Sequence, residues 1–490
     1  MSTPVSALPK DRPDGDRPGH VEVLGYDYIP ESERHGEPRE LFGVWAPAMI
    51  APIYLLLGGI LMVLGMNLWQ ALLALVLGNA AFVLIGLQAS AGPKAGTPTI
   101  TISRSQYGFH GNKFASFAAW FNLVAFEALN FTVGATALYA LAAEAGLELS
   151  DPVKALALGV VIAGTFLLAY LGHATIVVFQ NVATWLLAAG AVLLFIFVLG
   201  DVNWSYSPES PLSGGAGLAL WFVGLGVIVS GAISWCNLPA DYSRYLPSRT
   251  SARPIVLWTT LGCLVPALFL GLTAILAGTA VDMTDPIAAL ESVVPGWFYP
   301  LLLIVLLVGS VANNTLTVYS SAMSLQTLGL RIKRYQGVFV DGIIGSAMAV
   351  YATFGTDFLT ALTEFLQIML CFYAPYTAIF LVDMWLRHNR YDGADLHRVG
   401  GGRYWSKSGW NIAGLAGLGS GILAAVLFAS TARVHGPLSN ALSDIDLSYI
   451  VGFLVGGAVY WGLARQAIRR PERQPATTEQ DGAATPSVTV

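Results

Sequence analysis

Long stretches of this chain contain no charged residue, and this feature limits what the chain can fold into. No charged residue occurs between Glu40 and Lys94 or between Lys154 and Asp201. A helix crosses the roughly 30 Å hydrocarbon core of a bilayer with about 20 apolar residues, so each stretch has room for two spans. Charged residues make up only 11% of the chain, whereas soluble domains carry about a quarter. The sequence therefore predicts an all-α integral membrane protein that is surrounded by the lipid bilayer.

The apolar runs add up to about twelve transmembrane helices. The first charge-free stretch breaks near Gly65 and the second near Gly172, which gives two spans each. Eight further single spans fit residues 115–143, 216–240, 254–281, 297–325, 337–356, 358–386, 409–431 and 447–466. Residues 1–40 and 467–490 are polar and contain no apolar segment, so we expect them to form tails outside the membrane, the second one disordered.

The distribution of Lys and Arg predicts the orientation of these spans. Loops 91–114, 241–253, 326–336 and 387–408 hold 14 of the 25 Lys and Arg residues. The loops that alternate with them are acidic and hold only Lys154 and Arg433. Cytoplasmic loops are the ones enriched in Lys and Arg. We therefore expect a multi-pass protein of the cell (inner or plasma) membrane with both termini in the cytoplasm.

Two of the spans carry helix-breaking residues at equivalent places. The first span reads WAPAMIAPIY, with Pro47 and Pro52, and the sixth reads SGAISWCNLPADY, with Gly231 and Pro239. A proline leaves one helical carbonyl without its usual donor, and that oxygen can then face an ion or a substrate. Paired breaks in two inverted halves are typical of secondary transporters, although ordinary proline kinks are the alternative.

Polar residues in two other spans suit recognition of a flat heterocycle. In the third span Phe126 and Asn130 lie four residues apart and share one helix face, which sets an aromatic ring beside an amide. In the eighth span Asn313, Asn314 and Thr317 form a turn rich in amides and hydroxyls. Polar side chains at such depth face the bundle or an aqueous cavity. For any one of them, hydrogen bonding between helices is the alternative.

Glu127 is an ionisable residue inside the third span, beside Phe126. A carboxyl at this depth is by default a functional hypothesis, because it could take up a proton on one side of the membrane and release it on the other. A structural carboxyl that is protonated or paired with Arg is the alternative. Glu364 in the tenth span is a weaker candidate of the same kind.

Several motifs occur along the chain in a characteristic order. They are GMNLWQALLALVLGN (residues 65–79), AGTPT (95–99), SRSQYGFHGNKF (103–114), ADYSRYLP (240–247) and RYDGADLHRVGGGRYWSKSGWNIAGLAG (390–417). With them, the chain resembles the nucleobase–cation symporter-1 family, in its purine–cytosine permease branch, from Leu41 to Trp461. The resemblance implies a leucine-transporter-type fold, in which two inverted five-helix repeats (41–200 and 216–386) precede two extra helices (409–466).

The resemblance also implies a function. Members import nucleobases by cation symport with alternating access, and uptake of hydantoin, allantoin or a thiamine-related pyrimidine on the same fold is the alternative. We therefore expect a small-molecule substrate, no cofactor besides the coupling ion, no nucleic acid, and a monomer. An integral membrane enzyme or a channel would belong to a different class, but the chain has no Walker-type loop, HExxH helix or GxSxG elbow.

The family's substrate-binding positions carry over unevenly. The stacking aromatic of the third span falls on Phe126, where a Trp is usual, and the amide one turn later falls on Asn130. The amides of the eighth span fall on Asn313 and Asn314, with Thr317 as a further candidate. A second aromatic, from the broken sixth span, falls on either Ala232 or Trp235. We favour the tryptophan because alanine cannot stack on a base.

The sodium site is where this sequence departs from the family. In sodium-coupled members, carbonyls of the first span, here near Ala48 and Ala51, join a carbonyl of the eighth span near Gly309 and two hydroxyls of the eighth span. The hydroxyl positions fall on Ala312 and Asn313, and alanine supplies no side-chain oxygen to Na⁺. The coupling ion is H⁺ or Na⁺, and this departure favours H⁺, with the carboxyl of the third span as its candidate carrier.

Overall fold

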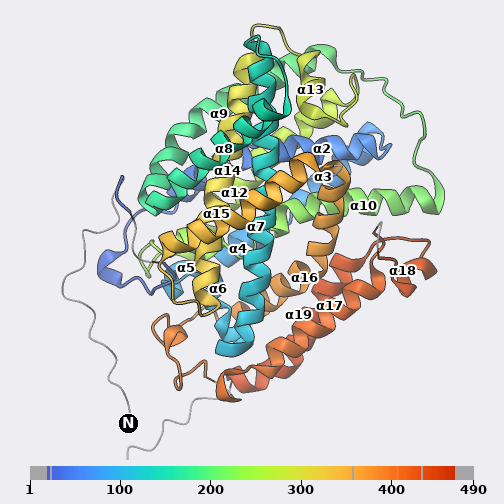
Figure 1. The fold of residues 1–490 in the computed structure, drawn as a ribbon. Coiled ribbons are helices and arrows are strands. Elements are labelled where there is room, and N and C mark those ends of the chain that lie inside the picture. Colours follow the sequence, from blue (N-terminus) through green and yellow to red (C-terminus); the bar gives the residue numbers. More distant parts are fainter. Residues whose placement is uncertain (1–18, 22–24, 356–357, 406, 432–433, 470–490) are drawn as a thin grey trace, which may run out of the picture.

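The chain folds into a bundle of helices (Figure 1). The computed structural model describes residues 19–21, 25–355, 358–405, 407–431 and 434–469. Within these ranges the one strand-type pairing is an isolated bridge between Ser430 and His435. The tail predicted to be disordered, 467–490, lies outside the described residues apart from its first three positions, where the last helix ends.

The helices follow one another closely along the chain. The first half contains α1 (Glu40–Met49), α2 (Pro52–Val63), α3 (Leu68–Asn79), α4 (Phe82–Ala89), α5 (Gly92–Ala95), α6 (Thr99–Ile102), α7 (Arg104–Glu144), α8 (Asp151–Leu171) and α9 (His173–Asp201). The second half contains α10 (Gly214–Ile233), α11 (Pro239–Ser243), α12 (Ala252–Ala277), α13 (Pro286–Glu291), α14 (Tyr299–Thr327), α15 (Arg334–Phe354), α16 (Phe358–Leu386), α17 (Ile412–Phe428), α18 (Pro437–Ala441) and α19 (Ser448–Arg469). Short 3₁₀ turns occupy Glu31–Glu33, Asp395–His397 and Lys407–Gly409.

Nine helical segments of the described residues are long and apolar enough to cross a membrane. They are Leu68–Ala95 (α3 to α5), α7, α8, α9, α10, α12, α14, α15 and the segment Ala361–Leu386 of α16. The bent pair α1 and α2 adds a tenth span. α17, with 17 residues, and α19 occupy the places of the last two predicted spans. The all-α membrane fold is confirmed, and the count of twelve stays a prediction.

Both predicted helix breaks are present. α1 ends at Met49 and α2 begins at Pro52, with a bend of 54° between them. Ala51, between the two helices, has an extended backbone (φ −122°, ψ 150°). Proline has no N–H to donate backwards and a φ suited to a first helical turn, so it begins a new helix rather than continuing the old one. In the same way α10 ends at Ile233 and α11 begins at Pro239.

α7 and α14 form the centre of the bundle, packed along each other (Figure 1). α1 packs against α9, α12 and α14, so the first break lies beside the centre of α14. α17 and α19 pack on each other and on α16, at one side of the bundle, where Figure 1 draws them in orange and red. The central helix pair therefore contacts the broken first span directly. The last two helices pack against α16, and α17 also against α7, away from that break.

A buried carboxylate ties the last helices to the start of α7. Asp383 of α16 is fully buried and accepts five hydrogen bonds. Its Oδ1 accepts from Arg387 Nε at 2.8 Å and from the Tyr460 hydroxyl of α19 at 2.6 Å. Its Oδ2 accepts from Ser105 Oγ (2.7 Å), Gln106 Nε2 (3.1 Å) and the Tyr391 hydroxyl (3.1 Å). One charge thus holds together α7, α16, α19 and the loop after α16.

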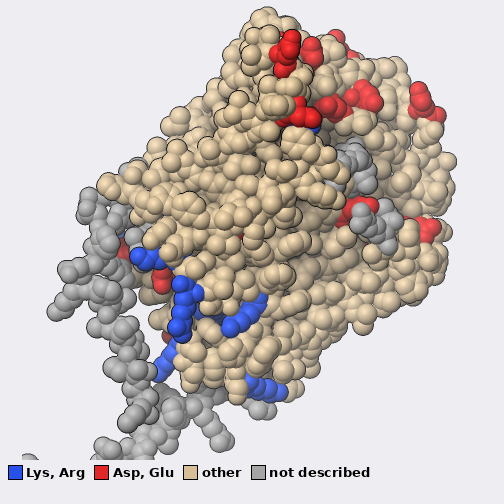
Figure 2. Space-filling view, in the orientation of Figure 1, with Lys and Arg blue, Asp and Glu red and all other residues tan. Residues whose placement is uncertain are grey.

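Charged side chains are segregated to opposite ends of the molecule. In Figure 2 the Lys and Arg side chains gather at the lower left, on the side where Figure 1 places α5 and α6. The Asp and Glu side chains gather at the top and along the right-hand edge of the same view. We call these the basic end and the acidic end. The basic end carries the loops 91–114, 241–253 and 387–408, whose positive charges were counted in the sequence.

The basic end also carries the half-buried imidazole of His397. The hydroxyl of Thr97 lies 3.0 Å from its Nε2. Burial, together with the charges of Arg104 and Arg244, lowers the pKa of His397 to about 3. The unfolded-state pKa of histidine is about 6.5, so this ring is neutral at physiological pH and does not titrate there. Acidification through pH 6 would favour the unfolded chain, in which the histidine is free to take up a proton.

Candidate substrate and cation site

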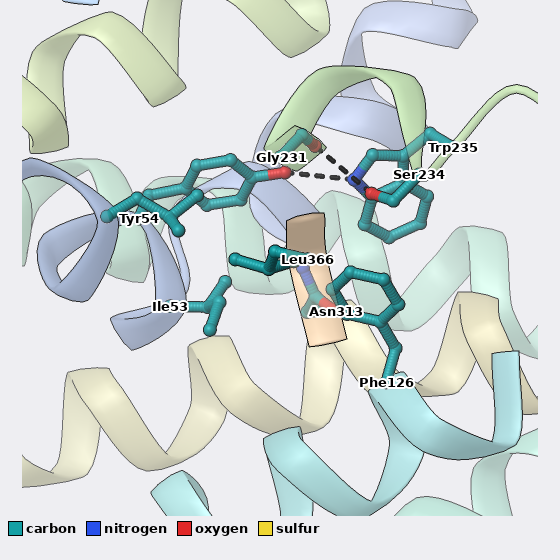
Figure 3. Close-up of a pocket in the computed structure, with 9 residues that line it drawn as sticks. Ile53, Tyr54, Phe126, Gly231, Ser234, Trp235, Asn313 and Leu366 are labelled. Atoms are coloured by element: carbon teal, nitrogen blue, oxygen red, sulfur yellow. Dashed lines mark hydrogen bonds between the residues drawn. The ribbon is translucent and has the colours of Figure 1, made fainter. Parts of the chain in front are cut away.

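A small pocket lies where the two broken spans meet α7 and α14 (Figure 3). The free volume within it is about 10 Å³, about the space of one water molecule. Its walls come from α2, from α10 and the turn after it, and from α7, α14 and α16. The lining residues are Ile53, Tyr54, Leu57, Phe126, Gly231, Ser234, Trp235, Asn313 and Leu366. Both helix breaks therefore open onto one enclosed site in the middle of the bundle.

Three aromatic side chains border this pocket from different parts of the chain, namely Tyr54, Phe126 and Trp235 (Figure 3). Trp235, in the turn after α10, donates its indole Nε1 to the Tyr54 hydroxyl at 2.9 Å, and Trp45 packs edge-on against it at 5.5 Å. Phe126 of α7 is held edge-on by Phe365 at 5.3 Å. Neighbouring aromatic rings fix both orientations, so the pocket offers a rigid surface for a flat ligand. Ala232, the alternative sequence position for the second aromatic, is not among the lining residues.

A chain of amide hydrogen bonds connects α7, α14 and the first helix break. Asn130 Nδ2 donates to Phe126 O at 2.9 Å and to Asn313 Oδ1 at 3.0 Å. Asn313 Nδ2 in turn donates to Ala48 O at 2.6 Å. Asn313 therefore contributes to the pocket wall and at the same time satisfies a carbonyl that the break in the first span sets free. Because Asn313 accepts from Asn130 and donates to the carbonyl of Ala48, a change at one end of this chain is transmitted to the other.

The other amide and hydroxyl predicted for the substrate site point elsewhere. Asn314 Nδ2 donates to Glu127 O on α7 at 3.1 Å, and Thr317 Oγ1 donates to Asn313 O at 3.3 Å. Neither residue borders the pocket, and neither does Asn130. Successive helical residues are about 100° apart around the axis. Asn313 and Asn314 therefore face different neighbours, and the structure brings only the first of them to the pocket.

Of the residues predicted for the cation site, Ala48, Ala51, Gly309 and Asn313 lie together at the first helix break. Gly309 of α14 packs directly against the break, because a Cβ there would meet Ile50 O and the Cα of Ala51. The carbonyl of Ala48 accepts the Asn313 amide, as described above, and the carbonyl of Ala312 accepts from Gln180 Nε2 of α9 at 2.7 Å. Both carbonyls thus have side-chain donors in this structure.

Several pocket residues were not predicted from the sequence. Tyr54 follows Pro52 by half a turn, so a helix start beside the break was the available signal for it. Ser234 lies beside Trp235 in the predicted sixth-span break, where any polar residue was a candidate. Ile53, Leu57 and Leu366 are apolar residues in apolar spans, and the sequence carries no signal that distinguishes them.

A buried pocket between two interrupted helices of a membrane bundle is the arrangement of a secondary transporter. Residues 28–452 match the model of the family described as permeases for cytosine and purines, uracil, thiamine and allantoin, and the chain belongs to this family. It is therefore a permease and not an enzyme.

Two curated relatives carry purine–cytosine permease names. YxlA of Bacillus subtilis (strain 168), named provisionally as a purine–cytosine permease, is 27% identical over 463 residues, which is 92% of this chain and 97% of the relative. The purine–cytosine permease fcyB of Emericella nidulans is 24% identical over 383 residues, 74% of this chain and 72% of the relative. The likeness thus extends over nearly the full length of a bacterial protein.

Solved structures confirm the leucine-transporter-type fold. Mhp1, a nucleobase-cation-symport-1 family transporter in a closed conformation with bromovinylhydantoin bound, superposes with a TM-score of 0.73 at 19% identity, covering 91% of this chain and 95% of Mhp1. The inward-facing conformation of Mhp1 gives a TM-score of 0.70 at 18% identity, covering 92% and 95%. A Na⁺-coupled sialic acid symporter gives 0.58 at 11% identity, covering 89% and 91%.

Proposed function

We propose that this permease imports nucleobases of the purine and cytosine type by proton symport with alternating access. The observation that carries the substrate class is the composition of the pocket, in which Phe126, Trp235 and Asn313 converge. Two rings offer stacking surfaces, and an amide offers both a donor and an acceptor to the edge of a base. The family description and the names of both curated relatives agree with this substrate class.

Other flat heterocycles are the second candidate. The family description includes uracil, thiamine and allantoin, and the Mhp1 structure holds a hydantoin. A five-membered hydantoin ring also stacks and hydrogen-bonds, so a panel of competitors separates the two classes. We expect cytosine or a purine to inhibit uptake of a labelled base at a concentration at which hydantoin and allantoin do not. Stronger competition by hydantoin or allantoin would replace the nucleobase assignment.

The proposed coupling to protons rests on the amide at the first helix break. Hard cations bind oxygen ligands, and the Asn313 amide places an N–H on Ala48 O, one of the carbonyls that Na⁺ would need. Ala312 supplies no side-chain oxygen, and its carbonyl is already bonded to Gln180. The carbonyl oxygens at the first helix break are therefore better suited to accept an amide hydrogen than to bind Na⁺.

Uptake should then respond to pH and not to Na⁺. We expect transport of a labelled base into cells or proteoliposomes to rise as external pH falls, and to continue at an unchanged rate when choline replaces Na⁺. The measurement is initial uptake rate across a pH series in both salts. Uptake that stops in choline and ignores pH would contradict proton symport.

The second expected result concerns Phe126. Phe126→Ala should weaken binding of the base by about 1–3 kcal/mol, roughly 5- to 150-fold in affinity, because it removes a stacking surface. Phe126→Trp should keep most of the affinity. Phe121→Ala is the matched control, since Phe121 lies on the same helix with its side chain exposed on the outer surface. Binding is measured by competition in membranes; an unchanged affinity in Phe126→Ala would remove this ring from the substrate site.

We also propose that the basic end faces the cytoplasm, because cytoplasmic loops collect Lys and Arg and Figure 2 shows those side chains together at one end. With that orientation both termini of this cell-membrane protein lie in the cytoplasm. We also propose that the protein acts as a monomer. Arg398, whose side chain is 67% exposed, is a suitable reporter position.

The orientation can be tested with single cysteines. Arg398→Cys should react with an impermeant maleimide only after the cells are opened, whereas Glu209→Cys in an acidic loop should react in intact cells. The native Cys236 and Cys263 are buried and give little background, and Cys371 is replaced by serine in both proteins. Labelling of position 398 in intact cells would show that the protein has the opposite orientation.

A further inference from the structure

A second buried polar site lies beside the pocket, on a different face of α7. Glu127 is 0% exposed, and neither of its carboxyl oxygens has a hydrogen-bond partner among the described residues. Its Oε2 points to Gly345 of α15, where an added Cβ would lie 3.2 Å from it. A buried polar group without a partner is strongly unfavourable. This carboxyl therefore requires a ligand or a proton that the surrounding side chains do not supply.

Asp341 faces the same space from α15, one turn before Gly345. It is also 0% exposed, but both of its oxygens are held. Trp120 Nε1 of α7 donates to Oδ1 at 2.6 Å, and Ser321 Oγ of α14 donates to Oδ2 at 2.7 Å. Glu127 lies close enough to Asp341 and to the Ser321 hydroxyl to interact with both. Three central helices thus bring two carboxyls around one hydroxyl.

The charges around this pair do not neutralise it. Within the described part of the chain, the charged partner of Glu127 is Asp341. Arg334, two turns earlier on α15, donates to two carbonyls of α8. Lys154 of α8 donates to a carbonyl at the other end of α15, and Tyr373 of α16 donates to a carbonyl of α7. Two desolvated carboxylates so placed repel each other, and one shared proton removes the repulsion.

We propose that Glu127 and Asp341 together form the binding site of the coupling proton, an inference that rests on the proton-symport function proposed above. One proton adds to a carboxylate oxygen of the pair from the outer side and leaves the same pair on the inner side, with no other bond made or broken. Asp341, fixed by two donors, holds the position of the pair, whereas the carboxyl of Glu127 has no such bond to any of the described residues. Trp120 and Ser321 are positioning residues.

The geometry also links this proton site to the substrate pocket. Glu127 directly follows Phe126, and its backbone oxygen accepts the Asn314 amide, while Asn313 next to it borders the pocket. The proton site and the substrate site are thus one residue apart along both central helices. The added proton lowers the charge of the pair from −2 to −1, which lowers the free energy of moving the loaded carrier past apolar surroundings. Binding at one site therefore changes the helices that form the other.

Proteoliposomes with an imposed inward proton gradient test the pair directly. We expect wild-type protein to accumulate labelled base, and Glu127→Gln and Asp341→Asn each to lose at least about tenfold of this accumulation, in the range of ordinary coupling free energies. Both variants should retain counterflow exchange, which needs no net proton movement. Retained counterflow also shows that the variants are folded. Glu144→Gln, at the exposed end of α7, is the matched control and should accumulate base like the wild type.

A second measurement follows the proton itself. In weakly buffered detergent solution, substrate binding to the wild type should take up about one proton per molecule, as expected when two interacting groups share one site, and both variants should take up none. Trp120→Phe keeps both carboxyls but removes a donor from Asp341, so we expect a shifted pH profile of uptake without loss of coupling. A structural role alone would lower expression and leave this profile unchanged.

The outcomes separate the two proposals. If wild-type protein does not respond to a proton gradient, proton symport is wrong and the pair has no coupling role. If the wild type responds and both carboxyl variants still accumulate base, only the assignment of the proton site is wrong. If Glu364→Gln loses coupling and the variants of Glu127 and Asp341 do not, the proton site lies on α16 and the proposed pair is wrong. Na⁺-dependent substrate binding that disappears in Asp341→Asn would make the pair a metal-cation site, which also overturns the proposal.

Discussion

Asp383→Ala is expected to lower the free energy of unfolding in detergent by about 3–5 kcal/mol, as is usual when one partner of a buried ion pair is removed. The carboxylate accepts five hydrogen bonds from the start of α7, the loop after α16, α16 itself and α19. Its loss leaves the Arg387 guanidinium, whose side chain is 13% exposed, without its counter-charge. The three hydroxyl donors and the one amide donor that remain inside would also lose their acceptor.

The measurement is the folded, monodisperse fraction after a heat or denaturant series, followed by fluorescence-detected size exclusion. Asp383→Asn should fall between alanine and the wild type, because an amide oxygen still accepts from part of the donors. Asp201→Ala, at the exposed end of α9, is the matched control and should unfold like the wild type. Equal stability of Asp383→Ala and the control would show that these hydrogen bonds do not hold the last helices to α7.

The positions of the spans could be predicted because hydropathy and helix-breaking residues are local properties. Pro52 and Pro239 begin new helices where the sequence indicated breaks, and α15 and α16 match the predicted spans 337–356 and 358–386 to within a few residues. The Asp383 cluster was not predictable in this way. Its donors come from positions as far apart as Ser105 and Tyr460, which only the packing of three helices brings together.

The substrate-binding role of the candidate residues stays a prediction. Of the residues that the resemblance assigned to that role, Phe126, Trp235 and Asn313 line the pocket, whereas Asn314 lies against α7. Adjacent helical positions differ by about 100° in direction, and the rotation of a helix within a bundle is set by packing that one sequence does not show. Asp341 was overlooked for a related reason. Asp341 lies five residues after the basic loop 326–336, and a carboxyl so close to a loop is expected at the membrane surface rather than inside the bundle.

Asn313→Leu is expected to reduce uptake efficiency by about 30-fold or more, because leucine has a similar shape but removes two buried hydrogen bonds. Ala48 O would lose its donor and Asn130 Nδ2 would lose one of its two acceptors. Each unsatisfied buried group costs about 1–3 kcal/mol, and 1.4 kcal/mol corresponds to a tenfold change. The pocket wall would also become wholly apolar at this point, so binding of polar bases should weaken more than expression of the protein.

Asn313→Asp separates the two roles of this amide. An aspartate still accepts from Asn130 but cannot donate to Ala48 O, and its charge instead faces the free carbonyl at the helix break. If the donated hydrogen takes the place of a cation there, Asn313→Asp should lose uptake in choline and recover part of it in Na⁺, since a carboxylate and carbonyls are suitable ligands for a hard cation. Thr315→Val is the matched control, because the Thr315 hydroxyl donates to Val311 O within its own helix. Uptake by Asn313→Asp that equals the wild type in choline would show that the N–H on Ala48 O is not needed for transport.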